Sequence, residues 1–192
     1  MRLLGIIAAF VLAGCAFAGE TAGSAPDCAS PSQQELLVCI SARVDLAEKR
    51  LQQSYAQTSS RVDAAHRQEL NSGQEHWQQF RNRYCQSVYD EISPGREAPI
   101  EKLACREQLA IDRTAELDYI LAGPSSEGFA ELLSALDRVG YARDEVVARL
   151  GAMYAHEEDW VKYLSAHCEL LASVTAANIR VCRARVNIER GY

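Results

Sequence analysis

The chain has 192 residues, a formal net charge of −6 at pH 7 and 7 cysteines. This length suits one medium-sized domain or two small ones, and the acidity disfavours nucleic acid as a partner. The four histidines do not fall at ligand spacings and no two cysteines form a C-x-x-C pair, so we expect neither a metal nor another cofactor.

The first 18 residues have the character of an export signal that takes no part in the fold. Arg2 supplies the positive charge, and the apolar run "LLGIIAAFVLAG" that follows is too short to span a bilayer as a mature helix. Removal of this signal would take away one positive charge and leave a more acidic protein.

Two cleavage sites compete within this signal. The sequence "LAGC" at 12–15 resembles a lipobox, in which residues 1–14 are removed and Cys15 becomes a lipidated membrane attachment point. The sequence "AFA" at 16–18 resembles an ordinary signal-peptidase site, which would discard Cys15. Both readings predict an exported protein, in the periplasm or held as an outer-membrane lipoprotein, with residues 19–27 as a flexible tether.

Six cysteines remain after Cys15: Cys28, Cys39, Cys85, Cys105, Cys168 and Cys182. An even number in an exported chain indicates three structural disulfides, although six cysteines allow fifteen connectivities.

Apolar residues recur at helical spacing from residue 31 onward, as in Leu36, Ile40, Val44, Ala47, Leu51 and Tyr55. Ser30 before Pro31 is a suitable N-cap, and Ser32 with Glu35 offers a capping box one turn later. Strand and hairpin signals are almost absent, so we expect an all-α fold. The expected helices cover 31–60, 62–92, 100–121, 126–138, 142–171 and 175–190, with a weak break after the first.

Two stretches of the chain repeat. "EHWQQFRNRYC" (75–85) aligns with "EDWVKYLSAHC" (158–168), and "CREQLAIDR" (105–113) aligns with "CRARVNIER" (182–190). Tryptophan precedes cysteine by eight residues in both copies, whereas the two cysteines of a copy are 20 residues apart in the first and 14 in the second. This pattern predicts an internal duplication, with a helical domain over 28–122 and a partial repeat over 123–192.

If the two helices of each copy pair as a hairpin, Cys85–Cys105 and Cys168–Cys182 would each join the helices of one copy near their turn. Cys28–Cys39 would hold the incoming segment on the first helix. Each bridge would contribute about 3 kcal/mol by the chain-entropy model. The expected core side chains are Trp77, Phe80, Tyr84, Trp160 and Tyr163.

Arg113 and Arg190 stand eight residues after the second cysteine of each copy. We expect a structural role for both, either paired with an acidic residue such as Glu75 or Glu158 or packed over the tryptophan. The alternative is that they contact a partner.

Residues 28–121 resemble the LprI-like lysozyme-inhibitor domain of bacterial envelope proteins. The resemblance lies in "CASPSQQELLVC" (28–39), "DLAEKRLQQSY" (45–55), "WQQFRNRYC" (77–85) and "CREQLAIDRTAEL" (105–117). It departs from the family at "SPGREAP" between the last two cysteines, at Leu109, where threonine is commoner, and at "LQ" before Tyr55. Residues 129–192 lack the first cysteine pair. The resemblance implies an exported protein that binds and inhibits lysozyme.

An acidic and disulfide-rigid protein would be steered towards a basic lysozyme. The candidate contact loop is "YDEISPGREAP", in which Asp90, Glu91 and Glu97 supply the acidity and Arg96 could meet a carboxylate of the lysozyme cleft. The alternative is an ordinary solvated connector. The second acidic stretch, "HEEDW" (156–160), has the pattern of a solvated helix face.

Enzyme signatures are lacking. "GPSSEG" is no nucleophile elbow, and "HEED" lacks the second histidine of a zinc protease. We therefore expect a non-catalytic protein. The rival to a lysozyme inhibitor is an envelope interaction or scaffold module without effect on lysozyme.

Overall fold

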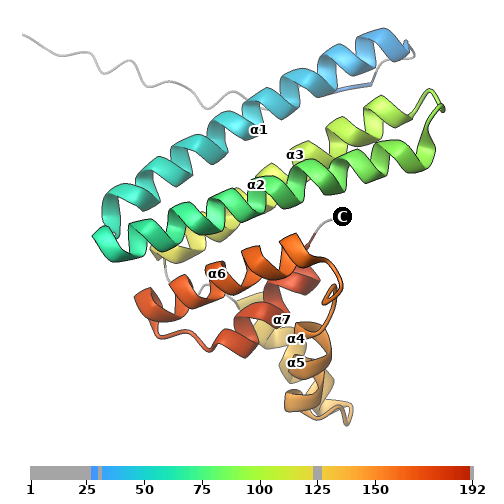
Figure 1. Ribbon diagram of the computed structural model, residues 1–192. Helices are drawn as coiled ribbons and strands as arrows, with labels where there is room; N and C mark the ends of the chain where they lie inside the picture. Colours follow the sequence, from blue (N-terminus) through green and yellow to red (C-terminus); the bar gives the residue numbers. More distant parts are fainter. Residues whose placement is uncertain (1–26, 30–31, 123–126, 191–192) are drawn as a thin grey trace, which may run out of the picture.

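The computed structural model describes residues 27–29, 32–122 and 127–190, and every regular element in these ranges is an α-helix (Figure 1). The helices are α1 (Gln33–Arg61), α2 (Ala64–Ile92), α3 (Ala98–Ala122), α4 (Glu127–Arg138), α5 (Arg143–Gly151), α6 (Glu158–Thr175) and α7 (Ile179–Glu189). The all-α fold is confirmed. The expected signal with Cys15, and the capping pair Ser30 and Pro31, lie outside the described residues.

Three long helices form the N-terminal part. The helices α1 and α2 both pack against α3, and α2 in turn carries α6 on its other side (Figure 1). The remaining helices build on α6, because α7 packs against both α6 and α5, and α4 packs on α5. The N-terminal helices therefore provide the frame on which the C-terminal part is mounted.

The turn between α1 and α2 is real, although the sequence signals it only weakly. Asp63 is the N-cap of α2 and its carboxylate accepts a hydrogen bond from the His66 backbone N–H, while Val62 is buried. At the start of α1, Ser32 does occupy the N-cap position, but its side chain makes no capping hydrogen bond, so the expected capping box is not formed.

The prediction of a single helix over 142–171 is wrong, because the chain forms two helices there, α5 and α6, with a turn between them. Tyr154 adopts a left-handed conformation with φ 58° in the intervening turn. Asn187 on α7 stabilises this break by donating from Nδ2 to the carbonyl oxygens of Leu150 (2.8 Å) and Met153 (3.2 Å). These carbonyls near the end of α5 are satisfied by a tertiary contact, which a local sequence pattern cannot reveal.

The last helix also begins later than residue 175. Ala176 ends α6 in a left-handed conformation with φ 58°. Asn178 then caps α7, since its side-chain oxygen accepts from the backbone N–H groups of Arg180 and Val181. Asparagine is among the best N-cap residues, so this boundary has a clear local cause.

Three disulfides join Cys28 to Cys39, Cys85 to Cys105 and Cys168 to Cys182, with Cα–Cα distances of 5.6 to 5.7 Å. These are the pairs that the helical-hairpin interpretation suggested. The first holds the incoming segment on α1, the second ties α2 to α3, and the third ties α6 to α7.

One hydrophobic core runs through both parts of the chain. It contains Leu70, Trp77 and Leu117 from α2 and α3 together with Trp160 and Leu171 from α6, all of them buried. A smaller cluster of Phe129, Leu133, Val147 and Ala184 lies between α4, α5 and α7. Buried side chains of α2, α3 and α6 thus pack into one core.

Candidate functional site

The two arginines of the predicted repeat are buried, and Arg113 lies at the junction of α2, α3 and α6. Its Nε donates to Oε1 of Gln74 (3.0 Å), and its Nη1 lies 3.3 Å from the Tyr163 hydroxyl and 3.2 Å from Nδ1 of His167. Its guanidinium also stands 5.1 Å from the centroid of the Tyr163 ring. The partner on α2 is therefore Gln74, where the sequence suggested Glu75.

Arg190 lies in an aromatic enclosure. Its guanidinium carbon is 4.1 to 4.8 Å from the centroids of four rings, those of Phe80, Tyr84, Tyr154 and Trp160. Both of its terminal nitrogens donate to Glu157, at 3.1 and 2.9 Å. The acidic partner is therefore Glu157, where the sequence suggested Glu158.

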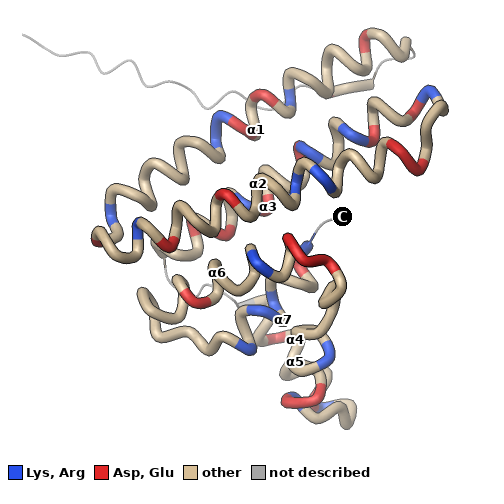
Figure 2. Tube along the Cα trace, viewed as in Figure 1, with Lys and Arg blue, Asp and Glu red and all other residues tan. Residues whose placement is uncertain are grey.

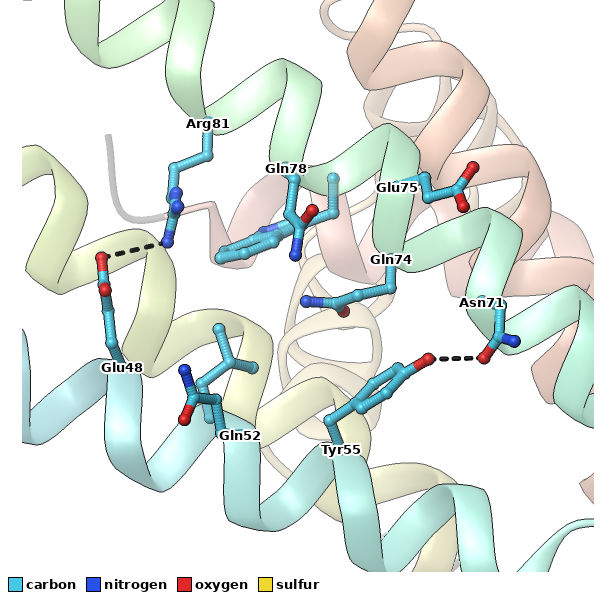
Figure 3. A pocket seen from close by; sticks show the side chains of 10 residues that line it. Glu48, Gln52, Tyr55, Asn71, Gln74, Glu75, Gln78 and Arg81 are labelled. Carbon is cyan, nitrogen blue, oxygen red and sulfur yellow. Dashed lines mark hydrogen bonds and ion pairs between the residues drawn. The ribbon is translucent and has the colours of Figure 1, made fainter.

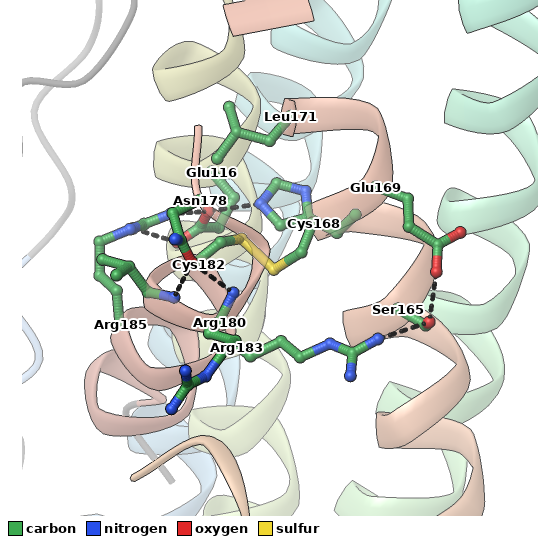
Figure 4. The surroundings of a disulfide bond; sticks show 12 residues. Glu116, Ser165, Cys168, Glu169, Leu171, Asn178, Arg180, Cys182, Arg183 and Arg185 are labelled. Carbon is green, nitrogen blue, oxygen red and sulfur yellow. Dashed lines mark hydrogen bonds and ion pairs between the residues drawn. A yellow bond between two sulfur atoms is a disulfide. The ribbon is translucent and has the colours of Figure 1, made fainter. Parts of the chain in front are cut away.

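A buried carboxylate, Glu116, lies close to the disulfide of the second hairpin (Figure 4). Arg185 donates to both of its oxygens, at 2.7 and 2.6 Å, and Nε2 of His167 donates to Oε2 at 2.7 Å. Burial alone would raise the pKa of Glu116, but the hydrogen bonds from His167 and Arg185 and the charge of Arg185 hold it at about 2.

His167 is neutral in this arrangement. Its Nδ1 accepts from Arg113 and its Nε2 donates to Glu116, which uses one donor and one acceptor. Burial first, and the nearby charges of Arg113 and Arg185, lower the pKa of this imidazole, against the opposing effect of Glu116. The group is thus a satisfied internal histidine.

This buried cluster has no room for a substrate. A cavity of about 80 Å³ next to it is lined by Trp77, Arg113, Glu116, Trp160 and Arg190, among others, which is enough for about one to three water molecules. Its charged groups already bind one another, so the cluster joins α3 to the C-terminal hairpin and offers no free acid, base or nucleophile.

The acidic stretch at 156–160 is not the solvated helix face that the sequence suggested. Asp159 is buried and forms an ion pair with Arg83 of α2, and Glu157 binds Arg190. Glu158 stays exposed, with Lys162 one turn further along. Asp159 therefore serves the packing of α6 on α2, whereas Glu157 joins the start of α6 to the end of α7.

The candidate contact loop lies at the free end of the α2–α3 hairpin (Figure 2). Asp90, Glu91, Arg96 and Glu97 are all exposed there. Asp90 accepts a hydrogen bond from Gln86 on the same helix, at 2.8 Å. The three carboxylates and the arginine are thus all exposed at the same end of the hairpin.

This end of the hairpin is held from several sides. Gln33 at the start of α1 accepts from Nε of Arg96 (2.9 Å) and donates back to its backbone carbonyl. Gly95 turns so tightly that a Cβ atom there would stand 2.7 Å from the Ile92 carbonyl oxygen. The Cys85–Cys105 disulfide fixes the two helices below. The loop is therefore a preformed surface.

A second candidate site was not recognised in the sequence. An open groove of about 410 Å³ lies between α1 and α2, which both rest on α3 (Figure 3). Leu51 and Trp77, both buried, form its floor. Its walls carry Gln52 and Tyr55 from α1, and Asn71, Gln74, Glu75 and Gln78 from α2.

Both ends of this groove are bridged. At one end Glu48 binds Arg81 (3.3 Å), which also lies 4.9 Å from the Trp77 ring centroid. At the other end the Tyr55 hydroxyl donates to Asn71 (2.5 Å). Figure 3 shows the side chains of Gln52, Gln74 and Gln78 between these bridges. On each helix the residues that line the groove recur at intervals of three or four positions. This spacing is the signal by which the sequence could have revealed the groove.

Within the described ranges, no helix combines the length and the apolar character that crossing a membrane requires. Within the same residues, no group of three or more histidine, cysteine, aspartate or glutamate side chains could hold a metal ion. Three disulfides are the pattern of an exported protein.

Comparison with known proteins gives one match. No curated protein and no solved structure is significantly similar to the chain. Residues 25–117, which include α1, α2 and most of α3, match the model of a family described as Lysozyme inhibitor LprI. This part of the chain, just under half of its length, contains both the α2–α3 end and the α1–α2 groove and is similar to the LprI family.

Proposed function

We propose that this protein inhibits a basic lysozyme outside the cytoplasm, by docking the end of its α2–α3 hairpin against the enzyme. The observation that carries the proposal is the family match, because its description is that of a lysozyme inhibitor and its range includes this hairpin end. The match leaves the contact surface open. The exposed carboxylates supply the argument for its position.

Charge and rigidity both favour this surface. Asp90, Glu91 and Glu97 are exposed on a chain with a formal charge of −6, and complementary charge accelerates the encounter with a basic enzyme. Gln33, Gly95 and the Cys85–Cys105 bridge hold the loop in one shape, which lowers the ordering cost of binding. Arg96, on the same surface, is the residue that could reach a carboxylate in the lysozyme cleft.

The test is a lysozyme turnover assay with the purified exported protein, at low and moderate salt. We expect stoichiometric loss of lysozyme activity that weakens as salt screens the charges. A triple variant, Asp90→Asn, Glu91→Gln and Glu97→Gln, should bind about tenfold more weakly, since each exposed ion pair contributes about 0.5 kcal/mol.

The matched control removes the same charge elsewhere. Glu131, Asp144 and Glu145 are exposed on α4 and α5, and their triple amide variant changes the net charge equally. Equal weakening by both triple variants would refute the α2–α3 end as the contact surface while leaving inhibition intact. If no lysozyme, animal or bacterial, were inhibited, the inhibitor proposal itself would fail and the envelope interaction module would replace it.

A further inference from the structure

We propose that the groove between α1 and α2 is a binding site for a neutral, N-acetylated oligosaccharide, one or two sugar rings in size. This site lies apart from the α2–α3 end and does not depend on lysozyme binding. It would give the protein a direct attachment to glycan in addition to any contact with an enzyme.

The free hydrogen-bonding groups of the groove suit a sugar. Gln52 and Gln78 are exposed on facing helices, and a primary amide offers one acceptor oxygen and two donor hydrogens. Sugar hydroxyls and acetamido groups likewise both donate and accept. The buried Arg113 donates a hydrogen bond to Oε1 of Gln74 and so orients this side chain. The NH2 group of Gln74 is left for a ligand.

The charge of the groove argues against an anionic ligand. Arg81 is the cation among the ten lining residues, against the two carboxylates Glu48 and Glu75. Glu48 binds Arg81 at 3.3 Å and is shared with Arg106, which lies outside the lining, at 2.6 Å. Glu75 adds a carboxylate on the wall, which would repel a phosphate or another carboxylate. The ligand is therefore uncharged where it meets the groove.

Size and shape limit the ligand further. The volume of about 410 Å³ falls within the usual range for small-molecule sites. The Glu48–Arg81 and Tyr55–Asn71 bridges close both ends of the groove, so it takes a short unit and not a long chain lying along it. Leu51 and Trp77 provide an apolar floor for the C–H face of a ring.

The groove is also preformed. Both walls are long helices packed on α3, and side chains one helical turn apart repeat every 5.4 Å or so. Binding groups on rigid helices lose little entropy when a ligand binds. This is the geometry that favours a weak but selective site for a small polar molecule.

The experiment is a titration of the full exported protein, labelled with ¹⁵N, with diacetylchitobiose and without lysozyme. We expect the side-chain amide signals of Gln52 and Gln78 to shift, together with the indole signal of Trp77. Gln78→Ala should weaken binding about three- to tenfold through the loss of hydrogen bonds. Gln79→Ala is the matched control, since Gln79 is exposed on α2 outside the groove, and should bind like the unchanged protein.

Two further ligands define the source and the chemistry. Shifts with the peptidoglycan disaccharide of N-acetylglucosamine and N-acetylmuramic acid, its lactyl carboxylate converted to the amide so that it is uncharged, would support the site and assign it to bacterial wall glycan. Shifts with diacetylchitobiose alone would support it for chitin-like glycans. Equal binding of cellobiose, which lacks acetamido groups, would overturn the N-acetyl specificity. Absence of shifts at millimolar ligand, or equal loss in Gln78→Ala and Gln79→Ala, would overturn the site. Lysozyme inhibition is measured separately, so either proposal can fail alone.

Discussion

Arg113 and Arg190 each pack against an aromatic ring of the other disulfide-linked hairpin, where the two hairpins are α2–α3 and α6–α7. Arg113 of the first hairpin stacks on Tyr163 of the second, and Arg190 of the second hairpin stacks on Phe80 of the first. In the aligned repeat Arg113 corresponds to Arg190 and Phe80 corresponds to Tyr163. Each hairpin therefore inserts the same arginine into the same aromatic position of the other.

This reciprocity extends to a second pair of positions. His167, beside Arg113, aligns with Tyr84, which packs against Arg190. Contacts that map onto themselves when two copies are exchanged are typical of two-fold related units. The arrangement supports the internal duplication that the sequence predicts. Because the family match ends at residue 117, the duplication stays a prediction.

Arg113 and Arg190 should be major stabilising groups. We expect Arg190→Gln to lower the free energy of unfolding by about 2–4 kcal/mol, since it removes four aromatic contacts and leaves Glu157 without its partner. Arg190→Lys should recover little, because an ammonium cannot reproduce the planar bidentate contact. Urea denaturation measures both. The exposed Arg180 on the same helix provides the control, and Arg180→Gln should change stability by less than about 0.5 kcal/mol.

The buried Glu116–His167 pair predicts that the fold weakens in acid. Burial and nearby charges lower the pKa of His167 below the 6.5 of a free histidine, so the unfolded chain takes up protons more readily as the pH falls through that range. Glu116, with a pKa of about 2 against the ordinary 4.5, adds to this loss below pH 4.5. Both contributions are complete at neutral pH and are lost on acidification.

Thermal unfolding between pH 7.5 and 3 measures this effect. We expect the Tm to fall steadily, and to fall less steeply between pH 7 and 5 in His167→Gln, which cannot take up a proton. A Tm that is flat from pH 7 to 4 would contradict the role of this pair. His156→Gln is the control substitution, because His156 is exposed just before α6.

The sequence predicts the fold class and the cysteine pairs well because their signals are local. Helical spacing fixes one face of α1, and Trp77 and Cys85 recur in the second copy at the same separation. The split between α5 and α6 has no comparable signal, since the carbonyls of Leu150 and Met153 are satisfied by Asn187, more than thirty residues away.

The same limit applies to the candidate site. Asp90, Glu91 and Glu97 are close in sequence and were recognisable as an acidic loop, whereas the α1–α2 groove depends on two helices placed side by side by α3. Glu116 likewise gives no hint of its partners, which are 51 and 69 residues further along the chain. Long-range pairing of polar groups is decided by packing and not by local pattern.

Asn187 should be a sensitive position for the C-terminal hairpin. Its side chain accepts from Nε1 of Trp160 (2.7 Å) and donates to two carbonyl oxygens at the end of α5. We expect Asn187→Ala to cost about 2–4 kcal/mol, because it leaves buried polar groups without partners, and to change the fluorescence of Trp160. Asn178→Ala, which removes only the cap of α7, should cost about 1 kcal/mol. Asn82→Ala, at an exposed position of α2, is the control and should change neither the stability nor the fluorescence.

The three disulfides should differ in their importance despite similar loop lengths. The sequence separations of 11, 20 and 14 residues predict nearly equal entropic contributions of about 3 kcal/mol each. Burial separates them, since Cys85 and Cys105 are 1% and 0% exposed whereas Cys28 and Cys39 are only partly buried. Replacing Cys85 and Cys105 by alanine therefore adds a cavity penalty, and we expect a loss of about 4–5 kcal/mol.

Paired alanine variants of each disulfide, compared by urea unfolding, test this order. The Cys28–Cys39 variant should remain folded with a loss of about 2–3 kcal/mol, and the Cys168–Cys182 variant should resemble the Cys85–Cys105 variant because Cys168 and Cys182 are also buried. If the Cys28–Cys39 variant were the least stable of the three, the packing around α3 could not be the main support of the fold. Lysozyme inhibition by the same variants gives an independent reading, because only the loss of Cys85–Cys105 loosens the α2–α3 end directly.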